Sequence, residues 1–487
     1  MSPVVALWLT LAIPLVGAVL IVMSNRHPNQ REAVTLFSAG ALFAVVLRLW
    51  MALSAGERPA VVLIETLPGL PLALSVEPLG ILFALVASLL WIVTSLYSIG
   101  YMRAHNEKHQ TRFYAAFAVA LASTMGVAFA DNMFTLFVFY EVLTLSTYPL
   151  VTHSGTEEAR RAGRVYLGVL LGTSIGLQLL AIVWTWTLTG TLTFQPGGIL
   201  GEAASPQVIG VLYALYIFGI GKAALMPFHR WLPAAMVAPT PVSALLHAVA
   251  VVKAGVFTIL KVSVYLFGLD VLADNGTTNW LLYVAAATIL LASLVAMTKD
   301  DLKARLAYST VSQLGYVVLG AALANSWGII GGGMHIAMHA FGKITLFFCA
   351  GAILVTTHKT EISQMAGLGR TMPVTMGAFL IGSLSIIGFP LLGGMWSKWY
   401  LALGTLDAGQ LLLLAVLMIS SLLNVAYLLP IPIRAFLATP DSANTPTKIK
   451  EAPVTCLAAI VLTALGSVAL FFYPEPLYRL ASLLVSQ

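Results

Sequence analysis

The sequence predicts an all-α polytopic membrane protein with about fourteen transmembrane helices, and three observations support this fold class. Hydrophobic residues make up 59% of the 487 residues, charged residues make up 9%, and the mean hydropathy is +0.93. Apolar runs long enough to cross a bilayer recur along the whole chain. Basic residues collect in alternate loops between those runs. A soluble chain of this composition would expose a largely apolar surface, so we expect lipid around most of this protein.

Each apolar run of about 18 residues or more is interpreted as one transmembrane helix. The runs lie near residues 3–23, 33–53, 79–101, 112–130, 132–151, 163–188, 207–227, 241–266, 280–298, 304–322, 327–355, 373–403, 410–435 and 453–473. The first run is long enough to span and has no basic segment before it, so no separate cleavable signal is expected. Because no low-complexity linker divides the chain, a single membrane domain over residues 1–487 is predicted.

The loop charges predict an orientation. An even number of spans places both termini on one side, and that side has three basic residues, Arg48, Arg58 and Arg479. The odd-numbered loops have seventeen: Arg26, Arg31, Arg103, Lys108, Arg112, Arg160, Arg161, Arg164, Arg230, Lys299, Lys303, Arg305, Lys359, Arg370, Arg434, Lys448 and Lys450. We therefore expect the termini outside and the odd-numbered loops in the cytoplasm of a bacterial cell. This bias explains the formal charge of +6 without a nucleic-acid partner.

Five lysines remain inside the predicted spans: Lys222, Lys253, Lys261, Lys343 and Lys398. A lysine at mid-depth costs at least about 2.5 kcal/mol on insertion scales, so it needs a partner or a water-filled cavity. Lys261 lies in the last third of its span, and we expect its side chain to extend to the membrane surface. The other four are predicted to belong to a path for ions.

Glu141 is the sole acid in the apolar run from Phe134 to Leu150. A buried carboxylate is neutral unless a cation stands close, so we expect Glu141 to pair with Lys222 and to switch with it as protons come and go. The alternative is a protonated glutamate that joins two helices by hydrogen bonds. Asp131 is interpreted as a solvated acid at a helix start, with an ion entry or exit site as the alternative.

Two spans are interrupted by glycine and proline, which is typical of transporters built from repeats. Pro227 is expected to free the carbonyl of Ala223 beside Lys222, and Pro390 to free the carbonyl of Ile386 before Lys398. Proline kinks that serve packing alone are the alternative.

The interrupted helices, 7 and 12, lie five spans apart, and an odd repeat unit inserts its second copy upside down. Spans 4–8 and 9–13 are therefore predicted to be inverted five-helix repeats. The predicted division is residues 1–111 for the first three helices, 112–266 and 280–435 for the repeats, and 453–487 for the C-terminal helix.

His335, His339 and Lys343 follow each other at intervals of four residues, so they share one helix face. Histidine titrates near neutrality and can pass protons through both ring nitrogens, so this stripe suits a proton relay, to which His247 is also assigned. A network of buried histidines bonded to hydroxyls is the structural alternative. A metal site is not expected, because Lys343 would repel a cation and no third histidine or carboxylate accompanies the pair. No haem, iron–sulfur, flavin or nucleotide motif occurs, so no cofactor is expected.

Four segments carry a resemblance to a known family. They are the stretch from Lys222 to Lys253, FYEVLTLSTYPL around Glu141, AYSTVSQLGY at 307–316, and EISQMAGLGRTMP with GFPLLGGMWSKWYL. Together they resemble the antiporter-like subunits of respiratory complex I, membrane-bound hydrogenases and Mrp-type Na⁺/H⁺ antiporters. The resemblance implies fourteen spans, inverted repeats and a hydrated axis of charged residues at mid-membrane.

The resemblance also assigns roles by position. Glu141, Lys222, Lys253 and Lys398 match the ionisable residues of spans 5, 7, 8 and 12. The family positions that link these ionisable residues are matched by His247, His335, His339 and Lys343. Lys398 and the APTPVSALLHAVAVVKAG and EISQMAGLGR segments most closely resemble the D-type subunit of Mrp antiporters.

We therefore predict a subunit that moves protons and a monovalent cation, Na⁺ or else K⁺ or Li⁺, through a relay of Glu, Lys and His side chains. It is expected to work with other subunits of an antiporter complex and to catalyse no chemical reaction itself. The alternative is a proton-pumping subunit of NADH-quinone oxidoreductase or of a membrane-bound hydrogenase. A passive assembly scaffold is disfavoured by the cost of burying the lysines.

Overall fold

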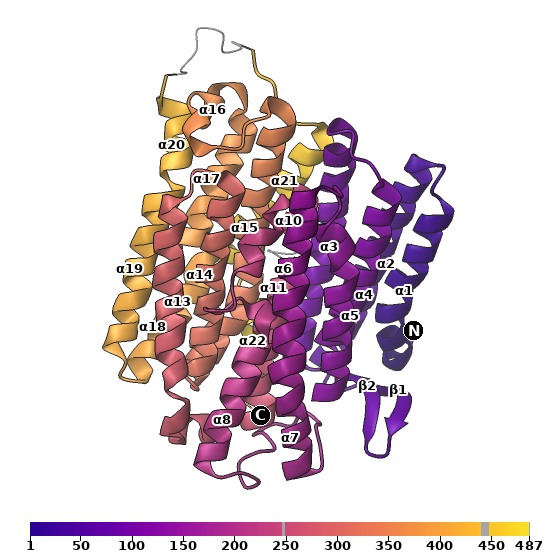
Figure 1. Ribbon diagram of the computed structural model, residues 1–487, viewed down its shortest axis with the longest axis vertical. Coiled ribbons are helices and arrows are strands. Elements are labelled where there is room, and N and C mark those ends of the chain that lie inside the picture. Colours follow the sequence, from indigo (N-terminus) through magenta and orange to yellow (C-terminus); the bar gives the residue numbers. More distant parts are fainter. Residues whose placement is uncertain (246–248, 440–447, 487) are drawn as a thin grey trace.

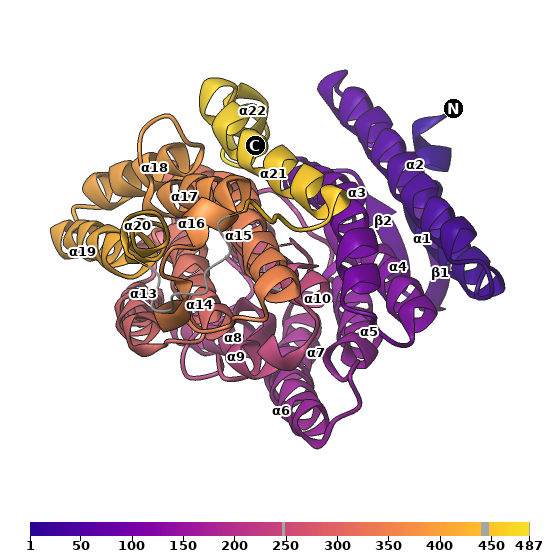
Figure 2. The same cartoon turned by 90° about the horizontal axis from the view of Figure 1, so that it is seen from above.

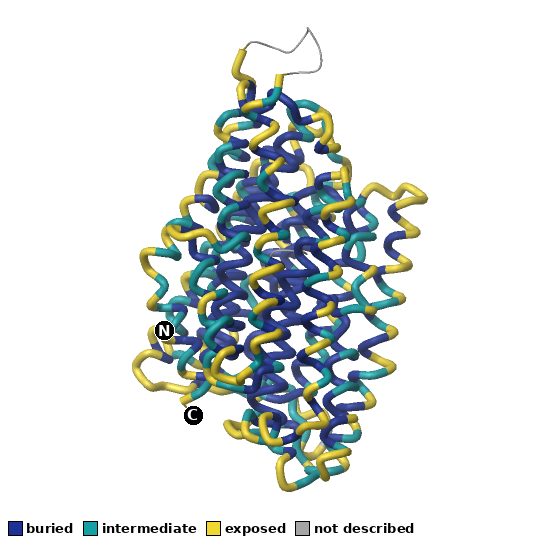
Figure 3. The backbone as a smooth tube through the Cα atoms, turned by 90° about the vertical axis from the view of Figure 1, so that its left-hand side faces the viewer, coloured by how far each residue is buried: buried dark blue, intermediate teal, exposed yellow. Residues whose placement is uncertain are grey.

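The computed structural model describes residues 1–245, 249–439 and 448–486. Most helices run along the long axis of one bundle, and a two-stranded hairpin lies at one end of it (Figure 1). We call this the hairpin end and the other the opposite end. Both termini lie toward the hairpin end in two perpendicular views (Figures 1 and 3), as an even number of crossings requires.

In the chain, the hairpin follows the second span and precedes the third. The elements are α1 (Pro3–Met23), α2 (Pro28–Ser54), β1 (Ala60–Leu67), β2 (Leu70–Ser75) and α3 (Pro78–Ala104). Each of these helices starts at a proline, whose missing N–H costs nothing at the first helical position. The antiparallel hairpin was not predicted, because strands of eight and six residues give no signal in a search for membrane-spanning runs.

The next five predicted spans contain two interruptions. The elements are α4 (Gln110–Ala128), α5 (Met133–Val151), α6 (Glu157–Thr173), the π-helical turn η1 (Ser174–Gln178), α7 (Leu179–Thr189), α8 (Pro206–Gly219), η2 (Gly221–Ala223), α9 (Trp231–Ala234), η3 (Ala235–Val237), α10 (Thr240–Ala244), α11 (Val251–Val262) and η5 (Ser263–Phe267). Span 7 unwinds after α8, and span 8 comprises α10 and α11, on either side of residues 246–248, which lie outside the described ranges.

The second group of five spans also has two interruptions. The elements are α12 (Leu269–Asp274), η6 (Gly276–Thr278), α13 (Trp280–Thr298), α14 (Leu302–Ala322), α15 (Ser326–Thr357), η7 (Ile362–Met365), α16 (Leu368–Thr371), α17 (Pro373–Ile387), α18 (Gly394–Asp407), α19 (Leu411–Leu428) and α20 (Pro430–Leu437). Span 12 is divided into α17 and α18, and span 13 bends where α19 meets α20. The last span, α21 (Val454–Phe472), is followed by the short α22 (Glu475–Ser482).

Several helices start where the sequence places a capping residue. The side-chain oxygens of Asn132, Thr156, Ser205, Asp301 and Asn325 accept backbone N–H groups in the first turns of α5, α6, α8, α14 and α15. Such caps satisfy donors that would otherwise be unpaired near the ends of a membrane bundle.

The predicted fold class is confirmed. Ten helices in the described part of the chain are long and apolar enough to cross a membrane, and α8 and α17 are shorter apolar helices. The remaining predicted spans are α14, which carries Lys303 and Arg305 in its first turn, and the divided span of α10 and α11. The repeat boundaries at 112–266 and 280–435 stay a prediction, although each group contains one span unwound in its middle.

Helix α15 occupies the centre of the bundle. Seen along the bundle (Figure 2), it lies between α3 on one side and α14, α17 and α18 on the other, and it packs against all four. Buried residues concentrate along the middle of the bundle, and exposed ones lie at its rim and ends (Figure 3). A polar stripe on α15 is therefore placed far from lipid on every side.

Candidate functional site

The unwound part of span 7 places Lys222 in the interior. Helix α8 ends at Gly219, and Lys222 lies in the single turn η2, fully buried. Its backbone N–H donates to the hydroxyl of Tyr140 at 3.1 Å. The break starts several residues before Pro227, so the predicted cause is wrong in position: the chain has already left the helix when it reaches the proline.

The ammonium of Lys222 is bound by one face of α5. Nζ donates to the carbonyl of Tyr140 at 2.8 Å and to Oγ1 of Thr144 at 2.5 Å. It also lies 3.1 Å from the centroid of the Tyr140 ring, a cation–π contact. The carbonyl beside the Lys222 ammonium therefore comes from the neighbouring helix α5 and not from Ala223.

Glu141 does not form the predicted ion pair. Among the described residues, its two carboxylate oxygens are buried and have no hydrogen-bond partner. The reason is helical geometry: Tyr140 and Thr144 share the face that meets Lys222, and the next residue, Glu141, is turned by about 100° from it. A buried carboxylate without partners is costly, so this position suits a proton or a cation that comes and goes.

Lys253 contacts the histidine stripe directly. It lies fully buried in α11, and its Nζ is in hydrogen-bonding contact with Nδ1 of His339 on α15. The rings of His339 and His335 stack with centroids 5.6 Å apart, and Nδ1 of His335 is 2.8 Å from Oγ of Ser397 on α18. Nε2 of both histidines is buried without a partner among the described residues.

Lys343, the third member of the stripe, turns to another helix. Its Nζ donates to Oγ of Ser309 on α14 at 2.7 Å, and the hydroxyl oxygen of Tyr427 lies 3.0 Å from the same Oγ. The hydroxyl of Tyr427 donates to Oδ1 of Asn424 on α19. This is a lateral branch of lysine and hydroxyl groups from α15 toward the outer helix α19.

Lys398 marks the second interrupted span. Helix α17 ends at Ile387, whose carbonyl accepts from Nζ of Lys398 at 3.1 Å, with Oγ of Ser421 at 3.3 Å. The carbonyl that the sequence predicted to be freed was that of Ile386. The true acceptor is one residue later because Gly388, with φ of +90°, ends the helix before Pro390 can do so.

Gly388 and Tyr316 fix the path of the Lys398 side chain. A Cβ at Gly388 would lie 2.8 Å from Cδ of Lys398. Nζ lies 4.8 Å from the centroid of the Tyr316 ring, which stacks on His335 at 5.5 Å. The Tyr316 ring thereby lies between Lys398 and His335 of the histidine stripe.

Consecutive contacts join Lys253, His339, His335 and Lys398, and we call these four residues the buried row. Lys222 lies apart from it. The two parts approach through the backbone, since a Cβ at Gly255 on α11 would lie 2.3 Å from the carbonyl carbon of Lys222. His247, predicted as a link, lies outside the described residues. The hydroxyl partners Ser397 and Ser421 were not predicted.

The expectation for Lys261 is wrong. Its side chain is 1% exposed rather than extended to the surface, and Nζ lies 2.6 Å from Oε1 of Glu77. Glu77 precedes α3, 184 residues away along the chain, and no sequence spacing points to such a partner. The resemblance did not assign these positions either.

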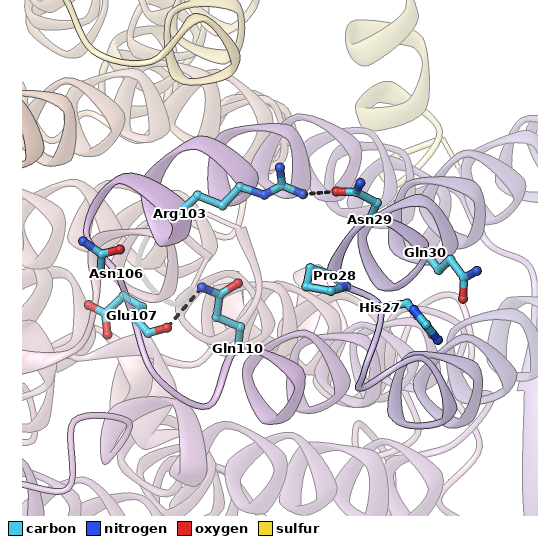
Figure 4. A pocket seen from close by; sticks show the side chains of 8 residues that line it. All are labelled: His27, Pro28, Asn29, Gln30, Arg103, Asn106, Glu107 and Gln110. Atoms are coloured by element: carbon cyan, nitrogen blue, oxygen red, sulfur yellow. Dashed lines mark hydrogen bonds between the residues drawn. The ribbon is translucent and has the colours of Figure 1, made fainter.

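A surface pocket of about 790 Å³ lies apart from this row, where the turn between α1 and α2 meets that between α3 and α4 (Figure 4). Arg103 donates to the side chain of Asn29, and Gln110 donates to the carbonyl of Glu107. Its lining is polar and open, unlike the enclosed lysine and histidine groups.

Comparison with known proteins identifies the family of the chain. The family described as NADH:quinone oxidoreductase/Mrp antiporter, transmembrane, matches residues 130–424, more than half of the chain. The chain belongs to this family. The matched range includes all the ionisable residues described above from Glu141 to Lys398.

Two curated relatives are similar in sequence. NADH-quinone oxidoreductase subunit N of Desulforudis audaxviator is 34% identical over 417 residues, which cover 82% of both chains. Hydrogenase-4 component B of Escherichia coli is 34% identical over 346 residues, covering 68% of this chain but only 50% of that protein.

Two solved structures share the fold along the whole chain. A chain of the Mrp complex from Dietzia sp. DQ12-45-1b superimposes with a TM-score of 0.89 at 23% identity, over 100% of this chain and 97% of that one. A chain of the archaeal membrane-bound sulfane sulfur reductase superimposes with a TM-score of 0.86 at 25% identity and the same coverage.

Proposed function

We propose that this chain is the ion-translocating, D-type subunit of a multisubunit Na⁺/H⁺ antiporter of the Mrp type. The observation that carries the proposal is the buried row from Lys253 through His339 and His335 to Lys398, with Lys222 bound beside Glu141. Nothing in a passive membrane anchor requires lysines without carboxylate partners at this depth.

A proton moves along this row by local exchanges. Lys253 as ammonium can give a proton to Nδ1 of His339, whose ring can release another from its unpartnered Nε2. Stacked rings do not exchange protons, so water must bridge His339 to His335, and again carry the proton past Tyr316 to Lys398. The step between Lys222 and Lys253 involves no side-chain contact among the described residues, and we assign it to His247.

Glu141 supplies the switch at the Lys222 end. When Glu141 is ionised, its charge favours the ammonium form of Lys222, and when it is protonated that support is lost. Moving one charge across the membrane is worth about 2.3 kcal/mol per 100 mV, so gradients of ordinary size can drive the exchange.

The Mrp assignment rests on the APTPVSALLHAVAVVKAG and EISQMAGLGR segments, on Lys398, and on a fold shared over the whole length of a chain of the Mrp complex. It implies partner subunits in the same membrane. The loop charges favour a bacterial plasma membrane with the hairpin end outside.

A second candidate function is a proton-pumping subunit of a redox-driven complex. It is favoured by the 34% identity with NADH-quinone oxidoreductase subunit N over 82% of both chains. In that case this chain moves protons, and electrons travel through other subunits.

The deciding experiment measures the dissipation of a pH gradient on addition of Na⁺, K⁺ or Li⁺. Everted vesicles carry the native operon with wild-type Lys222, with Lys222→Ala, or with Lys108→Ala as a control at an exposed loop lysine. We expect a cation response in the wild type and the control and none in Lys222→Ala. Proton pumping that requires NADH or another reductant, without a cation response, would favour the redox-driven complex.

A further inference from the structure

A second group of ionisable residues lies between the described row and the hairpin end. Glu77 stands directly before α3, Lys261 lies in the last turn of α11, and their ion pair measures 2.6 Å. The carbonyl of Ala130, in the turn after α4, accepts from the same Nζ at 2.6 Å. Three separate segments thus meet at one buried ammonium.

The pair reaches from the interior toward water. The Lys261 side chain is 1% exposed, whereas the Glu77 side chain is 14% exposed. Although the two atoms are close, Oε1 of Glu77 has no hydrogen bond of good geometry among the described residues. Of the two side chains, that of Glu77 is therefore the one that can exchange protons with solvent.

Lys261 lies on nearly the same face of α11 as Lys253. Eight residues separate them, which corresponds to about 12 Å along the axis and about 80° around it. Phe257 lies halfway between them, and its ring packs against that of Phe83 on α3 with centroids 5.0 Å apart. Phe83 is six residues, about 9 Å, into α3 from Glu77.

These distances place an apolar layer between two charged groups. Phe83 and Phe257 are fully buried and lie between the level of Lys253 and that of the Glu77–Lys261 pair. Two packed phenyl rings offer no group that can carry a proton, so a proton needs water to cross this layer. When they part, a short chain of water can join Lys253 to Lys261.

Building on the proposed function, we propose that Glu77 and Lys261 form a terminal proton-exchange site on the hairpin side of Lys253. The Phe83–Phe257 pair separates this site from Lys253. In the resting pair Lys261 holds the proton and Glu77 does not. Lys261 passes its proton to Glu77, Glu77 passes it to water at the hairpin end, and neutral Lys261 then accepts the next proton from Lys253. The reverse order describes uptake.

The first test measures cation-driven or reductant-driven proton movement in the same vesicles. The variants are Glu77→Gln, Lys261→Met and the double variant, which removes both charges but keeps the shape. We expect each to slow transport by about tenfold or more, as the loss of a proton-transfer group does. A structural ion pair predicts that the double variant, free of unpaired buried charge, restores the wild-type rate, and that result overturns the proposal.

The second test addresses the aromatic layer. Phe257→Ala should raise the passive proton leak several-fold without added cation, and Phe257→Leu, which keeps apolar bulk, should not. Vesicles with normal amounts of assembled Phe257→Ala complex and no extra leak would overturn the role of this layer. This test stands even where the charge variants fail to assemble.

The two proposals fail separately. If wild-type vesicles move no protons under either drive, the proposed function fails. If the wild type is active and Lys222→Ala is inactive, but the double variant at 77 and 261 transports normally, only the terminal site is refuted.

Discussion

Each of three lysines in the buried network is bound by neutral groups rather than by a carboxylate. Lys222 donates to a carbonyl and a threonine, Lys343 to a serine, and Lys398 to a carbonyl and a serine. A lysine paired with a carboxylate leaves an unbalanced charge when it loses its proton. A lysine held by dipoles can lose and regain the proton at smaller cost, which suits a relay.

Thr144 provides the test of this argument at Lys222. Thr144→Val removes the hydroxyl that accepts from Nζ but keeps the shape, and a hydrogen bond to a charged group contributes about 1.5–3 kcal/mol. We expect transport to fall by about tenfold, since about 1.4 kcal/mol corresponds to one factor of ten. Vesicle assays should show Thr144→Ser near the wild type, and a fully active valine variant would contradict this role of the hydroxyl.

His153 lies outside the spans, in the turn after α5. From its burial we expect the free energy of unfolding to fall in acid. Burial is the main cause that lowers its pKa from the ordinary value of 6.5, although nearby Glu107 acts in the other direction. The folded protein therefore binds this proton less readily than the unfolded chain. Its stabilising contribution is complete above about pH 6.5 and is lost as the pH falls from there through the lowered pKa.

Thermal unfolding of the purified protein between about pH 7.5 and pH 5 measures this effect. His153→Gln should show a smaller drop in Tm with acid than the wild type. His105→Gln, which changes an exposed histidine beside the same Glu107, should keep the wild-type slope. Equal slopes for wild type and His153→Gln would show that this residue does not carry the acid sensitivity.

The sequence located the charged residues of the row well, because a lysine in an apolar run is conspicuous. It could not give their partners. Lys261 was assigned to the membrane surface from its place in the run, since depth along one span reveals nothing about Glu77 on another helix. Glu141 was paired with Lys222 from their charges, whereas one residue of helical rotation directs Tyr140 and Thr144 there instead.

At the scale of elements, the two unwound spans are what bring these lysines inside. The turn η2 is held on both sides: the indole of Trp231 donates to the carbonyl of Gly221, and α11 packs against Lys222 through Gly255. The backbone at the break is therefore buried in protein, the condition under which a non-helical segment is tolerated at membrane depth.

Gly255 gives the corresponding prediction. A Cβ there would lie 2.2 Å from the backbone nitrogen of Ala223, so Gly255→Ala must displace η2. We expect a loss of about 1–3 kcal/mol in stability, the usual cost of overpacking, together with reduced transport. Gly377→Ala in α17 is the control, because nothing lies within 4 Å of a Cβ there. Equal Tm and transport for both variants would show that α11 does not fix the break.

The positions of the breaks show the limit of proline as a signal. Pro227 and Pro390 correctly mark the interrupted spans, but the helices end earlier, at Gly219 and Ile387. At Gly219 the chain packs closely on the π-helical turn, since a Cβ would lie 2.4 Å from the backbone nitrogen of Gln178. Such a contact depends on the folded bundle and leaves no local pattern.

At the scale of the whole molecule, the hydropathy was sufficient to predict an all-helical membrane fold, whereas the orientation that the loop charges indicate stays a prediction. Both follow from the bilayer, which acts on every segment in the same way and requires no knowledge of tertiary contacts. The hairpin of β1 and β2 was not predicted, because it lies outside the spans. Its outer surface, with Val62 and Ile64 exposed, has no equivalent constraint.

The orientation of the bundle is the last prediction. If basic loops remain in the cytoplasm, the hairpin end faces outward. A variant without Cys349 and Cys456 can carry one new cysteine, either Glu65→Cys in the hairpin or Glu158→Cys at the start of α6, near the opposite end. Both positions are exposed, so a membrane-impermeant maleimide should label the first in intact cells and the second only after permeabilisation.

The orientation also fixes the direction of the proposed relay. With the hairpin end outside, the Glu77–Lys261 pair exchanges protons with the external medium. The reverse labelling pattern would place this pair on the cytoplasmic side and make it the internal terminus. The charge bias of the loops would then need another cause, because positively charged loops would have crossed the membrane against the usual rule.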